Sequence, residues 1–393
     1  MKSVASFTHD PEVLPRRKRL SACEQATPGE GPRYRLKILA VIPSLTRGGA
    51  ERVLSLLTRD WAKCHNVVVA AFDASQPAYE YHGRVVSLGL RLPPKHALAS
   101  VYAASVSTLR LITLFRAEAP DRIISFMEPA NFPAILASVV SGTLDRAVVS
   151  VRQNPSILSA TRRLLIPRLY RLPSAVVACS DGVRSALVAM GVPAEHVTTI
   201  PNPIVLPSGS PCTTPKTRPA SERFVLAAGR LTPAKGFDML LSAFSVVRSG
   251  IRDLNLVVLG DGPERDHLLS LARRLGIDDR VCFPGSVRNI SRWYQSAECF
   301  VLSSRNEGWP NVLVEAMAAG CPVVSFRCDY GPEEIVQHGT SGLLVAAGDV
   351  DALARSITRV VTNRVLSATL SAGAQRRAQW FASQAVSPRW LTQ

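Results

Sequence analysis

Two glutamates stand eight positions apart around a predicted strand-to-helix turn. Glu307 and Glu315 lie in the run SRNEGWPNVLVEAMAAG, residues 304–320, which follows the apolar run Cys299–Ser303. A carboxylate accepts two hydrogen bonds from vicinal hydroxyls, so two such acids predict contacts with two diols, such as a sugar ring and a ribose. For Glu307 a structural alternative stands beside this interpretation, because an acid before a helix is also stabilised by the helix dipole.

The helix after this turn is expected to begin with Pro310 at its first position and to end with Gly320 at its C-terminal cap. Asn311 and Glu315 are four residues apart and therefore share a face of that helix. Free N–H groups near residues 310–313 would meet a diphosphate lying between the two acids. The pattern predicts a nucleotide sugar bound along one strand-to-helix turn.

Both halves of the chain open with an apolar strand that runs into a glycine-bearing turn, at Thr46–Glu51 and at Gly229–Gly236. Glycine lets a backbone approach a ligand closely, and the helix that follows offers N–H groups to an anion. Neither turn fits the dinucleotide or P-loop glycine patterns. The second turn carries Arg230 and Lys235, which together favour a diphosphate, although either alone could be a surface charge.

The composition predicts an ordered protein, and its basic charge suggests an anionic partner. Of 393 residues, 47% are hydrophobic and 19% charged, so a large core is expected. No run is long and apolar enough to span a bilayer, and no secretory signal is expected at the N-terminus. The net charge of +16 is concentrated in residues 1–200 and indicates nucleic acid, a phosphorylated substrate or an anionic membrane, unless it serves solubility alone. Eight cysteines without metal-binding spacing are interpreted as small buried residues in a reducing compartment, and no metal site is expected.

Short apolar runs alternate with helical patterns along the whole chain. Strands buried on both faces and separated by helices predict parallel sheets, hence an α/β fold with two doubly wound domains and a cleft between them. Strand runs are expected at residues 36–44, 66–72, 84–88, 122–127, 147–152, 175–180 and 197–201, and again at 224–228, 254–259, 281–284, 299–303, 322–326 and 342–345. The predicted organisation is a mobile basic tail at 1–34, an N-terminal domain at 35–205, a linker at 206–222, a C-terminal domain at 223–365 and a C-terminal segment at 366–393. The aromatic residues of this last segment dock on the first domain or cap the second.

Several motifs in order along the chain resemble the retaining glycosyltransferases of family 4. They are the Glu307/Glu315 spacing, Gly229-Arg230-Leu231 with Lys235-Gly236, Gly260–Glu264, Phe283–Val287, Asn202–Ile204, Gly48–Val53 and the later Asp329–Ile335. The resemblance covers residues 36–365, with the 299–345 block most specific. The resemblance implies the GT-B fold of two facing Rossmann-like domains. Within the family, the chain is similar to bacterial enzymes that extend lipid-linked polysaccharide repeat units.

The resemblance implies a role for each matching residue. Arg230 and Lys235 would hold the donor diphosphate, Glu307 would bind hydroxyls of the donor sugar near the anomeric carbon, and Glu315 would bind the ribose. The remaining implied contacts are the base against Pro284, Gly285 and Val287, the phosphate against the amides of Asn311, Val312 and Leu313, and the acceptor against Gly48 and Gly49. No metal or other cofactor is implied.

One departure from the family pattern concerns the expected His-Glu-Pro segment. Met127 stands where members of the family often have histidine, while Glu128 and Asn131 remain. A histidine role therefore cannot be assigned, and a substrate-assisted front-face displacement is the expected mechanism. Glu128 is a candidate catalytic residue or a cap of the helix that follows.

Two further segments of the first half of the chain carry polar or charged residues that could contact a substrate or a membrane. Arg152 and Asn154 are candidates for contact with acceptor phosphate, or simply form a polar strand end. Residues 160–172 mix arginines with apolar residues, which suits a helix on anionic lipid headgroups with Tyr170 at the interface. A buried helix with extended arginines is the alternative.

The expected function is transfer of a hexose or N-acetylhexosamine from a UDP-sugar to a saccharide linked to polyprenyl diphosphate, on the inner face of the plasma membrane. A UDP-sugar epimerase on the same fold is an alternative, although it would need a cleft histidine, and the seven histidines fall mostly outside strand ends. A nucleic-acid-binding protein is a third interpretation. It is disfavoured because aromatic residues make up only 6% of the chain and because it leaves the two glutamates unexplained.

Overall fold

The computed structural model describes residues 35–89, 97–206, 223–287 and 289–393. The predicted tail at 1–34, and the predicted linker except Leu206, lie outside the described residues. The chain forms two compact units. The first comprises residues up to Ser150 with Arg168–Val176 and Ser387–Gln393, and the second comprises Val151–Pro167 and Val177–Val386.

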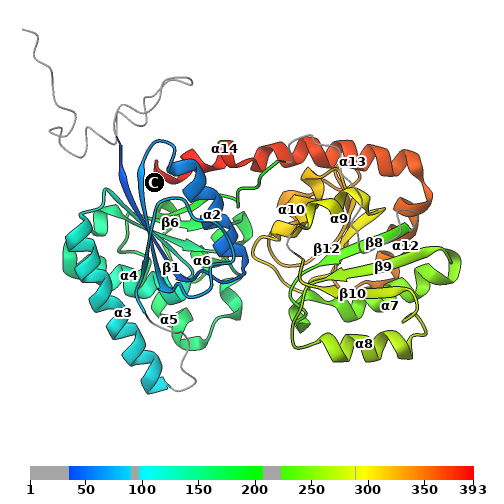
Figure 1. The fold of residues 1–393 in the computed structure, drawn as a ribbon, viewed down its shortest axis with the longest axis horizontal. Coiled ribbons are helices and arrows are strands. Elements are labelled where there is room, and N and C mark those ends of the chain that lie inside the picture. Colours follow the sequence, from blue (N-terminus) through cyan, green and yellow to red (C-terminus); the bar gives the residue numbers. More distant parts are fainter. Residues whose placement is uncertain (1–34, 90–96, 207–222, 288) are drawn as a thin grey trace, which may run out of the picture. The chain divides into compact units, whose positions relative to one another are not determined.

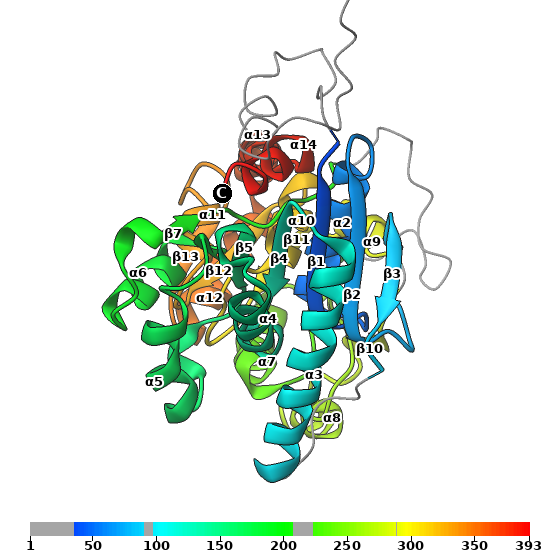
Figure 2. The same cartoon turned by 90° about the vertical axis from the view of Figure 1, so that its left-hand side faces the viewer.

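The first half of the chain builds a seven-stranded sheet in the order β3-β2-β1-β4-β5-β6-β7. Its strands are β1 (Lys37–Ser44), β2 (Asn66–Asp73), β3 (Arg84–Ser87), β4 (Arg122–Phe126), β5 (Ala147–Val151), β6 (Ala175–Ala178) and β7 (Val197–Thr199). The central strand β1 pairs in parallel with β2 and with β4 (Figure 2). Its residues Ile38–Ile42 are fully buried, as expected for a strand covered on both faces.

Helices connect these strands in the right order for parallel pairing. They are α2 (Gly49–Trp61), α3 (Ala97–Glu118), α4 (Glu128–Ser141), α5 (Ala160–Leu169) and α6 (Asp181–Ala189), with 3₁₀ turns at Leu144–Arg146, Pro155–Ile157 and Ala194–His196.

The second half builds a six-stranded sheet in the order β10-β9-β8-β11-β12-β13. Its strands are β8 (Arg223–Ala228), β9 (Leu254–Leu259), β10 (Val281–Gly285), β11 (Cys299–Leu302), β12 (Val323–Arg327) and β13 (Leu343–Ala346). All of these neighbours pair in parallel. Both sheets therefore have the Rossmann-like order, which confirms the predicted α/β class with two such domains.

Helices cover both faces of the six-stranded sheet. They are α7 (Phe237–Gly250), α8 (Arg265–Arg274), α9 (Ser291–Ser296), α10 (Asn311–Ala318), α11 (Pro332–Ile335), α12 (Val350–Thr362), α13 (Arg364–Ala378) and α14 (Ser383–Val386). Helix α7 packs against α8 and α12, whereas α10 packs against α9 and α13 (Figure 1). The core between helix α7 and the sheet contains Phe237, Phe244, Val258 and Phe326 among its buried side chains.

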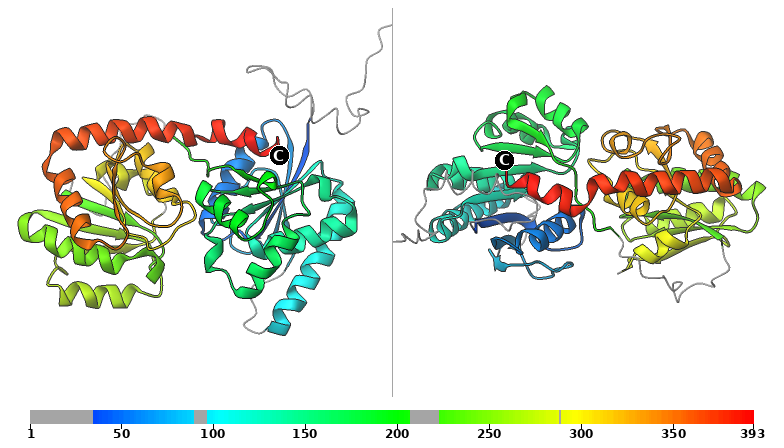
Figure 3. Two further views of the ribbon diagram at one scale, coloured as in Figure 1. Left: turned by 180° about the vertical axis from the view of Figure 1, so that it is seen from behind. Right: turned by 90° about the horizontal axis from the view of Figure 1, so that it is seen from above.

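Helix α13 is an element that the sequence pattern did not predict. It lies in the orange-red part of the ribbon and contacts α10 and α12 (Figure 3). Ser371 donates a hydrogen bond to the carbonyl of Gly320, and the backbone carbonyl of Thr340 stands 1.9 Å from where a Cβ would lie at Gly373. The helix is thus held by close backbone approach rather than by a strongly apolar face.

The aromatic residues after α13 divide between the two units. Trp390 is fully buried in the first unit, where its ring stacks on Phe126 at 5.3 Å and meets Trp61 edge-on at 6.5 Å. Phe381 packs edge-on against Trp309 in the second unit, with ring centroids 5.2 Å apart. Trp380 remains exposed.

Two expectations about local structure are corrected. Tyr170 does not lie at a lipid interface, because its side chain is fully buried and its hydroxyl accepts a hydrogen bond from Asn131 at 3.0 Å. Pro310 is the N-cap residue of α10 rather than its first helical residue, since the helix begins at Asn311. Among the described helices, none combines the length and the apolarity needed to cross a bilayer.

Candidate active site

The topology of the six-stranded sheet brings two turns together. Strands β8 and β11 are neighbours, yet the chain leaves β8 toward β9 on one side and β11 toward β12 on the other. This is the topological switch point, beyond whose carboxyl ends ligands bind in open α/β sheets. The turn after β8 contains Lys235 and the turn after β11 contains Glu307. The switch point therefore holds one cation and one acid from different parts of the predicted donor site.

Lys235 and Glu307 form an ion pair at this position. The Nζ atom of Lys235 donates to Oε1 of Glu307 at 2.6 Å, and the side chains are 25% and 9% exposed. The hydroxyl of Ser304 donates to the same oxygen at 2.6 Å. Ser303 ties the turns further by donating to the carbonyl of Lys235 at 3.0 Å. Because both hydrogen bonds engage Oε1, the carboxylate of Glu307 is oriented before any ligand arrives.

The thiol of Cys328 lies within the electrostatic field of the Lys235–Glu307 ion pair. Burial, together with the negative charge of Glu307, raises the pKa of Cys328 to about 12, and Lys235 opposes that shift. The neighbouring Asp329 accepts a hydrogen bond from the amide of Glu307 at 3.2 Å through its carbonyl. The segment after β12 thus fixes the backbone of the acid.

Glycines permit the close packing of these turns. Gly260 has φ +132°, and a Cβ there would lie 1.9 Å from the carbonyl oxygen of Gly229. Gly236 has φ +61°, and its Cβ would lie 2.1 Å from the carbonyl oxygen of Ser303. Backbone hydrogen bonds join the same turns, since Gly229 donates to Leu259 at 2.9 Å. These positions require glycine for both conformation and space.

The N-terminus of α10 faces the same turn region. Its N-cap, Pro310, provides no side-chain hydrogen bond, and the amide of Leu313 bonds back to the carbonyl of Pro310 at 3.0 Å. The amides of Asn311 and Val312 are the first two of the helix, where intrahelical acceptors do not exist. Such amides and the helix dipole suit a phosphate.

The other predicted donor contacts lie on the surrounding turns. Arg230 is exposed on the turn after β8. Glu315 is half-buried on α10, and the hydroxyl of Tyr294 donates to its Oε2 at 3.3 Å. Pro284 and Gly285 end strand β10, and the carbonyl of Gly285 accepts from the amide of Gly260 at 2.9 Å. Val287 follows on the same turn and is half-buried.

The corresponding turn of the first sheet is built differently. Gly48 caps α2 and Gly49 begins it, after the end of β1. The carboxylate of Glu51 folds over Gly48, so that a Cβ there would lie 2.1 Å from Oε2, and Ser44 donates to Oε1 at 3.3 Å. Gly48 has φ −163°, an extended conformation open to any residue. This turn presents an acid where the second presents cations.

Glu128 lies in the first turn of α4 and is fully buried. The N-cap residue of α4 is Met127, which has φ +71° and makes no side-chain capping bond. Asn131 is buried and donates to the carbonyl of Ser150 at 3.0 Å, while the hydroxyl of Ser125 lies 2.7 Å from its Oδ1. The positive φ of a non-glycine residue at Met127 marks a constrained backbone at the end of β4.

Arg152 and Asn154 have partners within the protein. Asn154 accepts from the amide of Ser156 at 2.8 Å and so caps a 3₁₀ turn, which matches the interpretation as a polar strand end. Arg152 donates from Nη1 to Oδ1 of Asn202 at 2.5 Å. Asn202 in turn donates to Oδ1 of Asn311 at 2.6 Å.

Sequence reasoning missed several residues of this region. Ser304 stands three residues before Glu307, but nothing in its spacing predicted a bond to that acid. Asn202 and Glu334 fall in segments whose resemblance was noted, without a role being assigned. Glu334 accepts from the amides of Asp181 at 2.7 Å and Gly182 at 2.9 Å, at the N-terminus of α6, and burial raises its pKa. Proximity of such distant residues becomes visible only in the folded chain.

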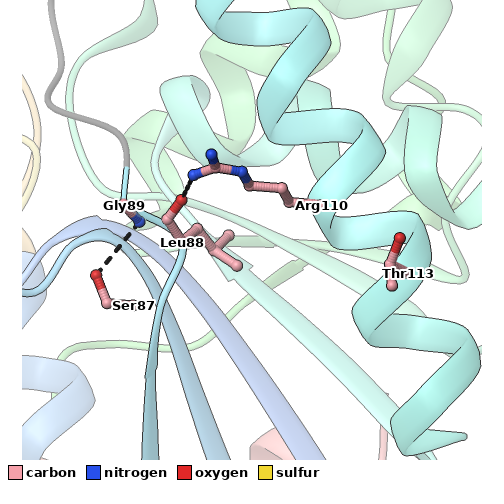
Figure 4. A pocket seen from close by; sticks show the side chains of 5 residues that line it. All are labelled: Ser87, Leu88, Gly89, Arg110 and Thr113. Atoms are coloured by element: carbon pink, nitrogen blue, oxygen red, sulfur yellow. Dashed lines mark hydrogen bonds between the residues drawn. The ribbon is translucent and has the colours of Figure 1, made fainter.

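Two other features bear on binding chemistry. Across the described residues, no group of three or more His, Cys, Asp or Glu side chains is placed to hold a metal ion. A surface hollow of the first unit is lined by Ser87, Leu88, Gly89, Arg110 and Thr113 (Figure 4). Arg110 bonds there to the carbonyl of Leu88, so its charge is engaged within the protein (Figure 4).

Comparison with known proteins places this geometry in a class of enzymes. The family described as "Glycosyltransferase Family 4" matches residues 47–206, and "Glycosyl transferases group 1" matches residues 214–377. In structure, the chain resembles the Anabaena protein HepE solved with UDP and glucose, with a TM-score of 0.78 and 24% identity over 91% of this chain and 98% of that one. Both halves of the chain therefore match glycosyltransferase families, and the fold is the GT-B fold of two Rossmann-like domains.

Curated relatives include proteins of bacterial surface-glycan synthesis. A lipopolysaccharide core biosynthesis glycosyltransferase, LpsE of Rhizobium meliloti, is 36% identical over 44% of this chain and 50% of its own length. An uncharacterized glycosyltransferase of Haemophilus influenzae is 31% identical over 42% of this chain and 47% of its length. The chain thus spans about half the length of these two relatives. An alpha-1,4-N-acetyl-D-galactosaminyltransferase of Campylobacter jejuni, named for a saccharide substrate linked to PP-undecaprenol, is 26% identical over 91% of this chain and 97% of its length.

Proposed function

We propose that the protein transfers a hexose or N-acetylhexosamine from a UDP-sugar to a lipid-linked saccharide during synthesis of a bacterial cell-surface polysaccharide. The observation that carries the proposal is the Lys235–Glu307 pair at the switch point of the six-stranded sheet, beside the N-terminus of α10. The pair combines a cation for phosphate and a carboxylate for hydroxyls in one turn region. The Campylobacter relative, named for a diphospho-undecaprenol substrate and aligned along almost its whole length, supports the lipid-linked acceptor.

The donor would lie across the turns that follow β8, β10 and β11. Arg230, Lys235 and the first amides of α10 are the groups for the diphosphate, where fixed positive charge offsets the charge of departing UDP. Glu307 would accept from sugar hydroxyls, and Glu315 from the ribose. The backbone at Pro284–Val287 would border the base.

The chemical step is proposed as a front-face displacement with retained configuration. An oxygen of an acceptor hydroxyl bonds to the anomeric carbon as the bond from that carbon to the β-phosphate oxygen breaks. The hydroxyl proton passes to the departing phosphate oxygen, and the electron pair of the broken bond leaves with UDP. Lys235 and Arg230 would stabilise that oxygen, while Glu307, already oriented by Ser304, would hold the sugar. No metal and no further cofactor enters this proposal.

Helix α5 is the proposed contact with an anionic membrane surface on the cytoplasmic face. Leu164 is 63% exposed and Leu165 is 38% exposed, and Arg162, Arg163 and Arg168 are exposed beside them. Exposed apolar side chains flanked by cations suit the boundary of headgroups and acyl chains. The burial of Tyr170 removes one residue from the surface expected from sequence but leaves these five.

The membrane contact is tested by sedimentation with vesicles of phosphatidylglycerol or of phosphatidylcholine alone. Binding to the anionic vesicles that falls in Arg162→Ser/Arg163→Ser, and that fades with added salt, is expected. Arg273→Ser/Arg274→Ser on α8 is the matched control. Equal binding by the α5 variant and the wild type would reject α5 as the contact.

The function is tested by UDP release from a panel of UDP-sugars, with and without lipid extract. We expect release from one sugar, dependent on lipid, and loss of at least about a hundredfold in Glu307→Ala and in Lys235→Ala, as for removal of a charged transition-state contact. Glu80→Ala and Lys63→Ala, exposed charges on the first unit, are the controls. If both site variants retain wild-type rates, the site assignment is wrong. Conversion of a UDP-sugar to its epimer without UDP release would instead favour the epimerase.

A further inference from the structure

A chain of three polar side chains reaches the first residue of α10 from two distant segments. Arg152 follows β5, Asn202 follows β7, and Asn311 begins α10. Nη1 of Arg152 lies 2.5 Å from Oδ1 of Asn202, and Nδ2 of Asn202 lies 2.6 Å from Oδ1 of Asn311. A second contact from Nη1 reaches the carbonyl of Ile200 at 3.4 Å. All of these residues belong to the second unit.

The chemistry of arginine fixes the direction of every bond in this chain. A guanidinium has only donors, so it must meet the oxygen of the Asn202 amide. The nitrogen of Asn202 is then left to donate, and it must meet the oxygen of the Asn311 amide. The nitrogen of the Asn311 side chain is consequently turned away from Asn202. Asparagine amides are otherwise free to flip, so this order depends on the cation at its far end.

The guanidinium of Arg152, at the far end of this series of hydrogen bonds, stays charged at neutral pH. The residue as a whole is half-buried, while its Nε and Nη2 atoms are covered by protein. Burial lowers the pKa of Arg152 to about 10, which still leaves the guanidinium charged. The backbone around it is also packed tightly, because a Cβ at Gly308 would lie 2.8 Å from the carbonyl oxygen of Arg152. Arg152 is therefore a fixed, charged end of the chain.

We propose that Asn202, oriented by Arg152, is a positioning residue that turns the donor half of the Asn311 amide toward the nucleoside diphosphate of the donor. The proposal rests on the proposed function, in which the first amides of α10 meet that diphosphate. Asn311 then adds an N–H donor to those amides instead of a repelling oxygen. Arg152 acts on the donor through Asn202 and Asn311 and does not contact the acceptor phosphate.

The variant that separates positioning from structural support is Asn202→Asp. An aspartate still accepts from Arg152 and forms an ion pair with it, so the melting temperature is expected to stay at or above that of the wild type. It cannot donate to Asn311, whose amide then flips and presents its oxygen to the diphosphate. Asn363→Asp is the matched control, because the side chain of Asn363 caps α13 and aspartate caps equally well.

The readout is the dissociation constant for UDP and for uridine, measured by calorimetry on the full chain. Asn202→Asp is expected to weaken the binding of UDP by about tenfold or more, as for the loss of one hydrogen bond to a charged group. The affinity for uridine should stay unchanged. In turnover, the donor KM rises while kcat stays within about twofold, as for uniform binding. Unchanged affinity for UDP, or equal losses for UDP and uridine, would overturn the positioning role.

A second variant covers the case in which Asn202→Asp does not fold. Asn311→Asp keeps an acceptor for Asn202, and the α10 dipole stabilises its charge, so folding is expected to survive. This variant should weaken the binding of UDP and leave the affinity for uridine unchanged. Wild-type affinity for UDP would reject the proposal. A wild-type protein that binds no UDP would refute the proposed function itself, and the positioning role would fall with it.

Discussion

The turns after β1 and after β8 occupy equivalent places in their sheets but carry opposite chemistry. Each joins the first strand of its sheet to a helix, and each has an acid in the first turn of that helix, Glu51 in α2 and Asp238 in α7. In the first turn, Glu51 folds back over Gly48 and fills the space above the glycine. In the second, Asp238 is drawn aside by Arg305, which bonds both its carboxylate oxygens at 2.8 and 2.6 Å.

This difference separates a turn whose glycine is covered by a carboxylate from the turn for which we propose an anion. Because Arg305 engages Asp238, the acid of α7 does not cancel the charges of Arg230 and Lys235. Arg305 also bonds the carbonyl of Pro233 at 2.6 Å, which ties the β11–α10 turn to the β8–α7 turn. The two turns therefore differ chiefly in where a single carboxylate is held.

The largest difference between the two turns is expected in the free energy of unfolding when alanine replaces one of their glycines. Gly260→Ala places a Cβ against the carbonyl of Gly229 and imposes a left-handed φ, so unfolding free energy should fall by roughly 2–4 kcal/mol. Gly48→Ala meets only the movable carboxylate of Glu51 at an extended φ, so its cost should stay below about 1 kcal/mol. Urea unfolding of both variants measures the contrast, and equal losses would show that the two turns are equally constrained.

The next difference concerns the arginine of each turn. Arg230→Met should weaken the binding of UDP by roughly ten- to a hundredfold, because a charged hydrogen bond to phosphate is lost. The affinity for uridine should stay unchanged. Arg47→Met removes the exposed arginine of the first turn and should leave UDP affinity within about twofold, as for surface substitutions. Calorimetric titration of both variants decides the matter. A loss in Arg47→Met equal to that in Arg230→Met would mean that the first turn also binds the donor.

The elements were largely predictable because their apolar runs are short and uninterrupted. The run 224–228 became β8 at Arg223–Ala228, and the run 254–259 became β9 without change. Helix α13 was missed because Arg364–Ala378 mixes polar and small residues without a marked apolar face. The close approach of Gly373 and the hydrogen bond of Ser371 to other backbone hold it in place. Tyr170 looked interfacial because a sequence of arginines and leucines does not reveal that Asn131, 39 residues earlier, provides a buried partner.

The site was predictable in its members but not in its pairing. Glu307 and Lys235 were assigned to different parts of the donor, since 72 residues separate them and nothing local indicates contact. Their pairing follows from strand order, which places β8 beside β11. The roles of the site residues remain predictions that the experiments above test.

A smaller effect of the second turn should appear in the chemistry of Cys328. Its thiol has a pKa of about 12, raised by burial and by Glu307 and opposed by Lys235. Glu307→Gln should lower that pKa and speed alkylation by iodoacetamide at pH 8, by less than about tenfold because burial dominates. Mass spectrometry follows Cys328, with the exposed Cys282 as internal control. Slower alkylation of Cys328 in this variant would contradict the contact.

The smallest expected effect is the pH dependence of the Asp238–Arg305 pair. The hydrogen bond from Arg305 holds the pKa of Asp238 below its usual value, so the ionised acid stabilises the folded state. That contribution is fully present above the unfolded pKa of roughly 4 and is lost as pH falls through the folded pKa. The difference in melting temperature between wild type and Asp238→Asn should therefore be positive at pH 7 and shrink toward zero below pH of about 4. For Glu51→Gln in the first turn, where Ser44 donates to the carboxylate, a matching decline would show that the two acids are held alike and would remove the contrast between the turns.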